Sequence, residues 1–233
     1  PFAFVGPSGN GKSRLLEGLR FAAQLDGLVF ATGSAREHGQ SPFAAIAEIL
    51  RGLLPALRAH APEAIEAHAP VLVKLAPTLA LAGGTEPVQP APEMESPRAE
   101  VLRLCAALAA AIGALAERRP VVIVLDDWHW ADAGSQEALA YLLRAAGSRP
   151  IAYVLGSRTA PPAGVEAVPV NGLDPAGVRR MLEAMLGGAA PAGGFVDQVA
   201  AVSQGSPAFV ERLLEHLVHA GTLVNARGGW QAP

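Results

Sequence analysis

The sequence has 233 residues, of which 51% are hydrophobic, and its 18 basic and 21 acidic side chains give a net charge of −3. This length suits one large domain or one domain with a small companion, and the charge gives no sign of a nucleic-acid-binding surface. No apolar run approaches the roughly 20 residues of a membrane span. A single cysteine, Cys105, excludes an internal disulfide framework. We therefore expect a cytoplasmic protein that contacts no membrane.

The chain is organised around residues 6–13, GPSGNGKS, which fit the phosphate-loop pattern G-x-x-x-x-G-K-[ST]. A short apolar strand at 2–5 precedes this loop, and a helix with one apolar face follows it. The glycines allow backbone angles that other residues resist, so the loop N–H groups point inward beside a helix N-terminus. We therefore expect residues 6–14 to bind phosphate: Gly6, Pro7, Ser8, Gly9, Asn10, Gly11, Lys12, Ser13 and Arg14.

Two residues of this loop have more specific expected roles. Lys12 would reach the β- and γ-phosphates of a nucleotide, and Ser13 would hold Mg²⁺. The chain has two lysines, Lys12 and Lys74, against sixteen arginines. A lysine in so arginine-rich a chain favours a phosphate role, since an arginine fork does not replace a compact ammonium. The alternative is a glycine-rich turn with a surface lysine.

The next part of the chain contains one strand followed by helices. A strand is predicted at 28–32, followed by a polar loop at 33–40. Ser41 and Pro42 have the residue types of an N-cap and a first helical position. Residues 55–97 predict a helical insert broken by prolines, which ends in an exposed loop at 83–97.

The second half alternates strands with helices and then becomes helical. A helix from Ser96–Pro97 to about residue 117 leads into the continuous β-branched run at 121–125, which is typical of a strand buried on both faces. Alternating strands and helices imply a parallel sheet with right-handed crossovers. The remaining predicted elements are a helix at 135–146, strands at 151–155 and 165–170, helices at 174–186, 194–202 and 207–220, and a hairpin at 222–230.

Three side chains at strand ends complete a candidate catalytic site. Asp126 ends the buried strand and is the expected Mg²⁺ ligand, while Asp127 could polarise the attacking water. Arg158 follows the next strand, on the sheet edge where open α/β folds bind ligands, and could sense the γ-phosphate. The alternatives are a solvated loop start for the two aspartates and a surface salt bridge for the arginine.

Three segments carry a family resemblance. Residues 125–132, LDDWHWAD, resemble the LDDLHWAD segment of STAND-type ATPases, which are related to AAA ATPases. Residues 204–214, QGSPAFVERLL, are similar to the GNPLFVEELL segment of that family, with Ser206 where asparagine is usual. Residues 156–158, GSR, match the family strand that ends in arginine. These modules occur in large LuxR-type regulators, in multidomain serine/threonine kinases and beside nucleotide cyclases.

The resemblance implies a fold and a division of the chain. It implies an ASCE P-loop α/β domain at 1–170, with a five-stranded parallel sheet in the order 5-1-4-3-2 and the insert at about 55–97. A helical lid would follow at 171–221. The hairpin at 222–233 would begin a truncated winged-helix domain, since the chain is expected to be a segment of a longer protein.

The resemblance also implies the roles of the site residues. Lys12 and Ser13 would bind phosphate and metal, Asp126 would ligate Mg²⁺ through water, and Asp127 would take the catalytic acidic place. Arg158 would act as the sensor, and Pro207 in the lid would pack near the adenine.

The expected function is an ATP- and ADP-binding switch that hydrolyses ATP slowly with Mg²⁺. It would serve attached effector domains of a signalling or transcription-regulatory protein and could self-associate in one nucleotide state. The alternatives are a nucleotide-binding scaffold without hydrolysis and a DNA-associated AAA-type ATPase. The acidic charge balance argues against direct nucleic-acid binding by this segment.

Overall fold

The computed structural model describes residues 1–37, 42–81, 88–188, 194–226 and 229–231. The chain divides into two compact units. The first contains Pro1–Phe4 and Leu15–Val168, and the second contains Val5–Arg14 and Pro169–Pro233. Residues of the phosphate loop therefore group with the C-terminal part of the chain.

Five strands form one sheet in the order β2-β3-β4-β1-β5, which confirms the predicted order 5-1-4-3-2. β3 pairs in parallel with β2 on one side and with β4 on the other, so that Thr32, Val124 and Val154 lie side by side. The strand bounds are β1 (Phe2–Val5), β2 (Val29–Ser34), β3 (Val121–Asp126), β4 (Ile151–Ser157) and β5 (Glu166–Pro169).

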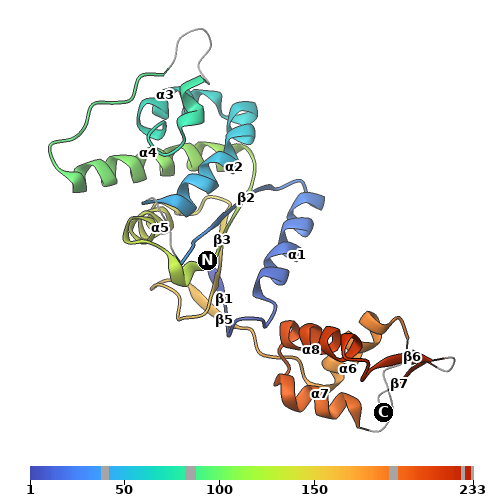
Figure 1. The fold of residues 1–233 in the computed structure, drawn as a ribbon. Helices are drawn as coiled ribbons and strands as arrows, with labels where there is room; N and C mark the ends of the chain where they lie inside the picture. Colours follow the sequence, from blue (N-terminus) through green and yellow to red (C-terminus); the bar gives the residue numbers. More distant parts are fainter. Residues whose placement is uncertain (38–41, 82–87, 189–193, 227–228, 232–233) are drawn as a thin grey trace. The chain divides into compact units, whose positions relative to one another are not determined.

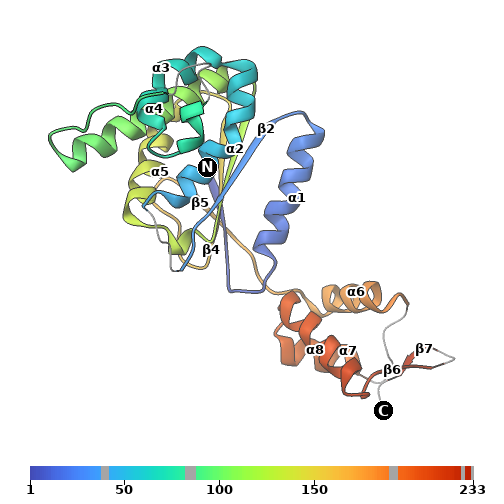
Figure 2. The ribbon, with the colours of Figure 1, turned by 45° about the horizontal axis from the view of Figure 1, so that its top comes forward.

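Helices cover both faces of this sheet, and the side chains of β3 show which helices lie on each face. Residues 121–125 are all buried, as the continuous apolar run predicts. Val122 and Val124 pack with Leu16 of α1 (Lys12–Leu25). Successive strand residues point to opposite faces, so Ile123 faces the other helices. Figures 1 and 2 show α1 on one side of the sheet, and α2 (Ala44–His60) and α5 (Ala133–Ala146) on the other.

The structure corrects two expectations about α2. The helix begins at Ala44, so Pro42 does not occupy its first position, and Ser41 lies outside the described residues. The cause is a distant contact: Asp132 Oδ1 accepts a hydrogen bond from the N–H of Phe43 at 3.2 Å, and Phe43 has a left-handed φ of 61°. The helix also runs through Pro55 without ending there. Pro55 is exposed, and the leucines on the opposite face are buried, so packing outweighs the missing backbone bond.

The helical insert continues with α3 (Pro62–Leu72), a 3₁₀ turn at Pro77–Leu81, and α4 (Pro97–Arg118). α4 begins where it was predicted, and Ser96 caps it, since its side chain accepts a hydrogen bond from the N–H of Ala99 at 3.1 Å. α4 is long and apolar enough to cross a membrane, which corrects the expectation that no such stretch exists. However, it packs between α3 and α5 and buries Cys105 completely, as a core helix does. Burial raises the pKa of that thiol.

The second unit ends in three helices and a hairpin: α6 (Pro175–Leu186), α7 (Phe195–Ser203), α8 (Pro207–His219), β6 (Val224–Ala226) and β7 (Gly229–Gln231). Val178, Val199 and Leu214 belong to its apolar core. Trp230 ties the hairpin to this core, because its indole N–H donates to the carbonyl of Leu186 at 2.8 Å. Phe209 is 42% exposed, since the buried stripe of α8 runs through Val210 and Leu214.

Candidate functional site

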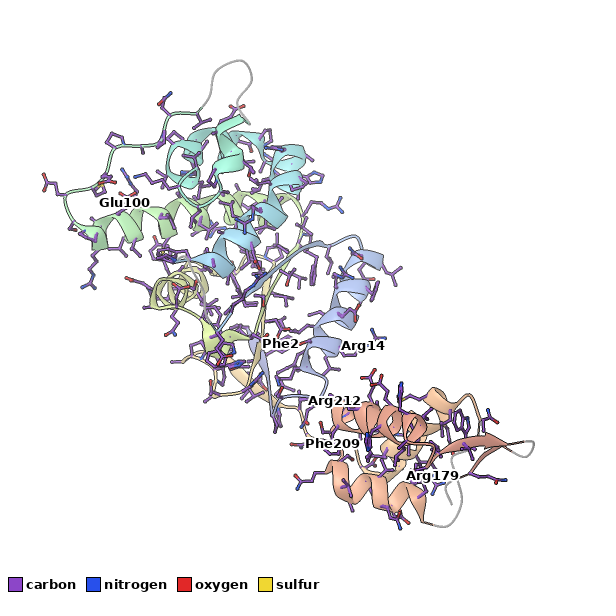
Figure 3. The ribbon with its side chains drawn as sticks, viewed as in Figure 1. Phe2, Arg14, Glu100, Arg179, Phe209 and Arg212 are labelled. Carbon is purple, nitrogen blue, oxygen red and sulfur yellow. The ribbon has the colours of Figure 1, made fainter. Side chains whose placement is uncertain are left out.

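The phosphate loop has the backbone shape that its glycines predict. Gly9 and Gly11 have φ values of 84° and 93°, in the left-handed region that favours glycine. α1 begins directly after them at Lys12, so the N–H groups of its first turn lie at the end of the loop. Ser13 and Arg14 are exposed in its first turn, and Figure 3 marks Arg14. Strand, loop and helix follow one another as a phosphate cradle requires.

Lys12 is held inside this loop. Its side chain is buried, with 7% exposure, and its Nζ donates to the carbonyls of Gly6 and Pro7 at 2.8 Å each. An ammonium with three donors can keep loop contacts while it binds an anion. The loop carbonyls therefore hold the ammonium at the loop, directly before the first turn of α1. The residues present fit a polyphosphate, since a glycine loop, the N-terminus of α1 and one ammonium lie together there.

Pro207 lies in the same unit as the phosphate loop, at the first position of α8. The next residue, Ala208, donates its N–H to the carbonyl of Gly9 at 3.1 Å. The beginning of α8 therefore sits directly on the tip of the loop. The structure thus brings together Pro207 and the loop residues, which the sequence had placed about 200 positions apart.

Asp126 ends β3 in the first unit, and its carboxylate extends over the neighbouring strand. A Cβ atom added to Gly156 of β4 would collide with Asp126 Oδ1 and would lie 3.0 Å from Cδ1 of Leu16 in α1. The absent side chain at Gly156 therefore makes room for the carboxylate on the α1 side of the sheet. A carboxylate in this place has the donor chemistry that Mg²⁺ prefers. The close approach of Asp126 to Gly156 was not predicted from the sequence, although a glycine in an apolar strand indicates close approach of another group.

Asp127 follows in a left-handed conformation with φ 50°, and its N–H donates to Asp126 Oδ1 at 2.8 Å. A non-glycine residue in this region costs roughly 1 kcal/mol, and such strain clusters at functional sites. The turn thus uses the backbone of Asp127 to hold the carboxylate of Asp126, while the side chain of Asp127 is half-buried. In this turn, Asp126 therefore supplies the carboxylate and Asp127 supplies the backbone N–H that holds it.

Arg158 follows β4 directly and is exposed. Leu125 pairs with Leu155, so Asp126 and Gly156 lie at the same level of the sheet, and Arg158 lies beyond the end of β4 on that edge. The sheet of the first unit thus presents the carboxylate and the guanidinium at the carboxyl ends of neighbouring strands. This is the edge at which open α/β sheets bind ligands.

The segment after Asp127 has a structural role. Trp128 is buried with 6% exposure, and Asp132 caps α5 by accepting from the N–H of Ser135 at 2.9 Å. Burial acts to raise the pKa of Asp132, but hydrogen bonds from Ser135 and Phe43 outweigh it and lower the pKa. A hollow of about 460 Å³ lies here and is lined by residues that include Trp130, Asp132 and Pro42. It contains none of the predicted phosphate or metal residues.

Comparison with known proteins identifies the chain. The family of AAA ATPase domains matches residues 4–155, which include the phosphate loop, Asp126 and Asp127. This chain belongs to the AAA ATPase domain family. It is therefore an AAA-related P-loop ATPase module. No curated protein matches the sequence.

A solved structure of Drosophila ORC bound to DNA resembles the fold. Its chain is 16% identical in sequence, with a TM-score of 0.44 over 80% of the present chain. The match covers 41% of the ORC chain, so the module spans less than half of that protein's length.

Proposed function

We propose that this AAA ATPase module binds ATP together with Mg²⁺, hydrolyses it slowly, and switches a larger signalling or transcription-regulatory protein. The phosphate loop carries this proposal, because Lys12 is held by the carbonyls of Gly6 and Pro7 directly at the N-terminus of α1. Such a group of amides and one ammonium recognises a β,γ-phosphate group. The family match over this segment supports the same assignment.

The hydrolytic half of the proposal uses Ser13 of the second unit and three residues of the first, Asp126, Asp127 and Arg158. Ser13 and Asp126 would hold Mg²⁺, which neutralises charge on the transferred phosphoryl group. The hydrogen bond from Asp127 N–H orients the Asp126 carboxylate, so Asp127 acts first as a positioning residue. Its side chain would orient the attacking water, and Arg158 would stabilise the γ-phosphate. Slow turnover is expected because aspartate reaches water less far than the glutamate found in many AAA enzymes.

The switch assignment concerns the whole protein. We infer that the segment after β5 acts as a lid whose position follows the nucleotide, that the lid acts on attached effector domains, and that the protein works in the cytoplasm. Nucleotide-dependent self-association would be one form of output. A scaffold that binds ATP without hydrolysis is the second candidate, and a single-turnover assay separates the two.

Substitution of the phosphate-loop lysine tests the proposal. Lys12→Ala removes a charge-assisted contact worth about 1.5–3 kcal/mol, so ATP affinity should fall at least about 10-fold. If the unaltered chain binds ATP weakly, binding by the variant should no longer be detectable. Lys74→Ala is the matched control, because it removes the only other lysine of the chain and leaves the loop intact. Titration with a fluorescent ATP analogue and Mg²⁺ measures both variants.

The outcomes separate the candidate functions. Unchanged affinity in Lys12→Ala would overturn the nucleotide assignment. Normal binding by the unaltered chain without phosphate release in a single turnover would favour the scaffold. Binding to a DNA duplex that weakens steeply with salt would instead favour the DNA-associated ATPase.

A further inference from the structure

Three backbone segments of the second unit meet in one close-packed joint. They are the phosphate loop at 6–10, the linker at 170–173 that follows β5, and the turn at 203–208 that leads into α8. The three segments come from widely separated parts of the sequence. Their contacts are made mainly by backbone atoms, so no side-chain pattern in the sequence announces them.

The phosphate loop contacts both of the other segments. The side-chain amide of Asn10 donates from Nδ2 to the carbonyl of Val170 at 3.1 Å, and the N–H of Val170 donates to the carbonyl of Val5 at 2.7 Å. At the tip of the loop, the carbonyl of Gly9 accepts the hydrogen bond from Ala208 at 3.1 Å. The linker is joined in turn to the α8 turn, since Leu173 N–H donates to Gly205 at 2.7 Å.

Glycines make this approach possible, and they leave no free space in the joint. A Cβ at Gly6 would collide with the carbonyl of Val170, and a Cβ at Gly205 would collide with the carbonyl of Leu173. A Cβ at Gly9 would lie 2.9 Å from Ser206 Oγ. Protein interiors packed this closely transmit displacements rather than absorb them.

We propose that Asn10 is a positioning residue through which the nucleotide state of the phosphate loop is passed to the lid. This inference rests on the proposed function and deepens it. A phosphate cradle binds its anion through loop N–H groups, while the side chain of Asn10 and the carbonyl of Gly9 in the same loop are bonded to Val170 and Ala208. A change at the phosphates therefore displaces the linker and the start of α8 together. Asn10 contributes a fixed contact to the lid and does not bind phosphate through its side chain.

Amide hydrogen exchange in the present chain tests this assignment. The N–H groups of Val170, Leu173 and Ala208 each donate across the joint and report on it directly. Asn10→Ala removes one hydrogen bond, which corresponds to about 2- to 10-fold faster exchange at these amides without nucleotide. Gln198→Ala is the matched control, since it truncates an exposed amide side chain on α7 of the same unit.

The nucleotide-dependent part of the experiment distinguishes coupling from a merely structural contact. Addition of ATP and Mg²⁺ should slow exchange at the three amides in the unaltered chain and in Gln198→Ala. In Asn10→Ala, at concentrations of fluorescent ATP that saturate the variant, the slowing at Val170 and Leu173 should be lost. Leucine has nearly the same shape as asparagine but no hydrogen-bond donor, so Asn10→Leu should give the same result as Asn10→Ala. It replaces the alanine variant if that variant unfolds.

Two results would overturn the role of Asn10. One is a normal nucleotide-dependent change at all three amides in variants that lack the donor. The other is nucleotide-free exchange at the joint equal to that of Gln198→Ala. If the unaltered chain did not bind ATP, the proposed function would fail, whereas the nucleotide-free comparison would still test the Asn10 contact.

Discussion

Gly156→Ala tests whether the carboxylate of Asp126 must extend across β4. The added methyl group would collide with Asp126 Oδ1 and would lie 3.0 Å from Cδ1 of Leu16, in a strand whose neighbours are buried. The carboxylate would have to rotate away and give up the hydrogen bond from Asp127 N–H. Overpacking and the lost bond together should lower the free energy of unfolding by about 1–3 kcal/mol.

The substitution should also slow catalysis. A metal carboxylate displaced by about 1 Å typically costs 10- to 100-fold in rate, so phosphate release should slow by that factor. ATP affinity should change little, because the phosphate loop is unaltered. Single-turnover release of labelled phosphate measures the rate, and a titration with a fluorescent ATP analogue measures affinity.

Gly18→Ala provides the control for this experiment. Gly18 is an exposed residue of α1 with no atom within 4 Å of its added Cβ, so the substitution should raise stability slightly and leave turnover alone. Normal phosphate release by Gly156→Ala, in a folded protein, would refute the reasoning that places the Asp126 carboxylate at the metal.

Two further substitutions address the second aspartate and the helical insert. Asp127→Asn should leave ATP binding intact, since asparagine tolerates the left-handed φ, but should slow phosphate release at least about 10-fold; an unchanged rate would remove Asp127 from catalysis. Glu100 contacts Lys74 and Arg103, which lower its pKa from 4.5 to about 2. Its folded-state pKa is depressed, so the ion pairs stabilise the protein above about pH 4.5 and are lost toward pH 2. Glu100→Gln should therefore lower Tm at pH 7, and thermal unfolding should show the difference shrinking on acidification; an equal difference at pH 7 and pH 3 would contradict this.

Local patterns in the sequence predicted much of this structure. The predicted helices at 96–117, 135–146 and 174–186 are present, and Ser96, Asp132 and Asp174 cap them with hydrogen bonds that join residues three positions apart. The continuous apolar composition of residues 121–125 likewise predicted a buried strand. The resemblance implied the strand order, and the sheet has that order.

Features that depend on distant contacts could not be predicted in this way. The beginning of α2 is determined by Asp132, which lies 89 residues away from Phe43. The bond between Asn10 and Val170 spans 160 residues and ends on a backbone carbonyl, which has no sequence signal. The domain limits and the roles of the individual site residues remain predictions, and the substitutions above are designed to test the site residues.

The burial of Cys105 has a practical consequence for spectroscopy. It is the only thiol in the chain, it has no exposed surface in α4, and its raised pKa keeps it in the unreactive protonated form at neutral pH. A second cysteine introduced at exposed Glu215 of α8 would thus react alone with a maleimide dye. The sequence thus contains no reactive thiol of its own, which is what single-site fluorescent labelling of this ATPase module requires.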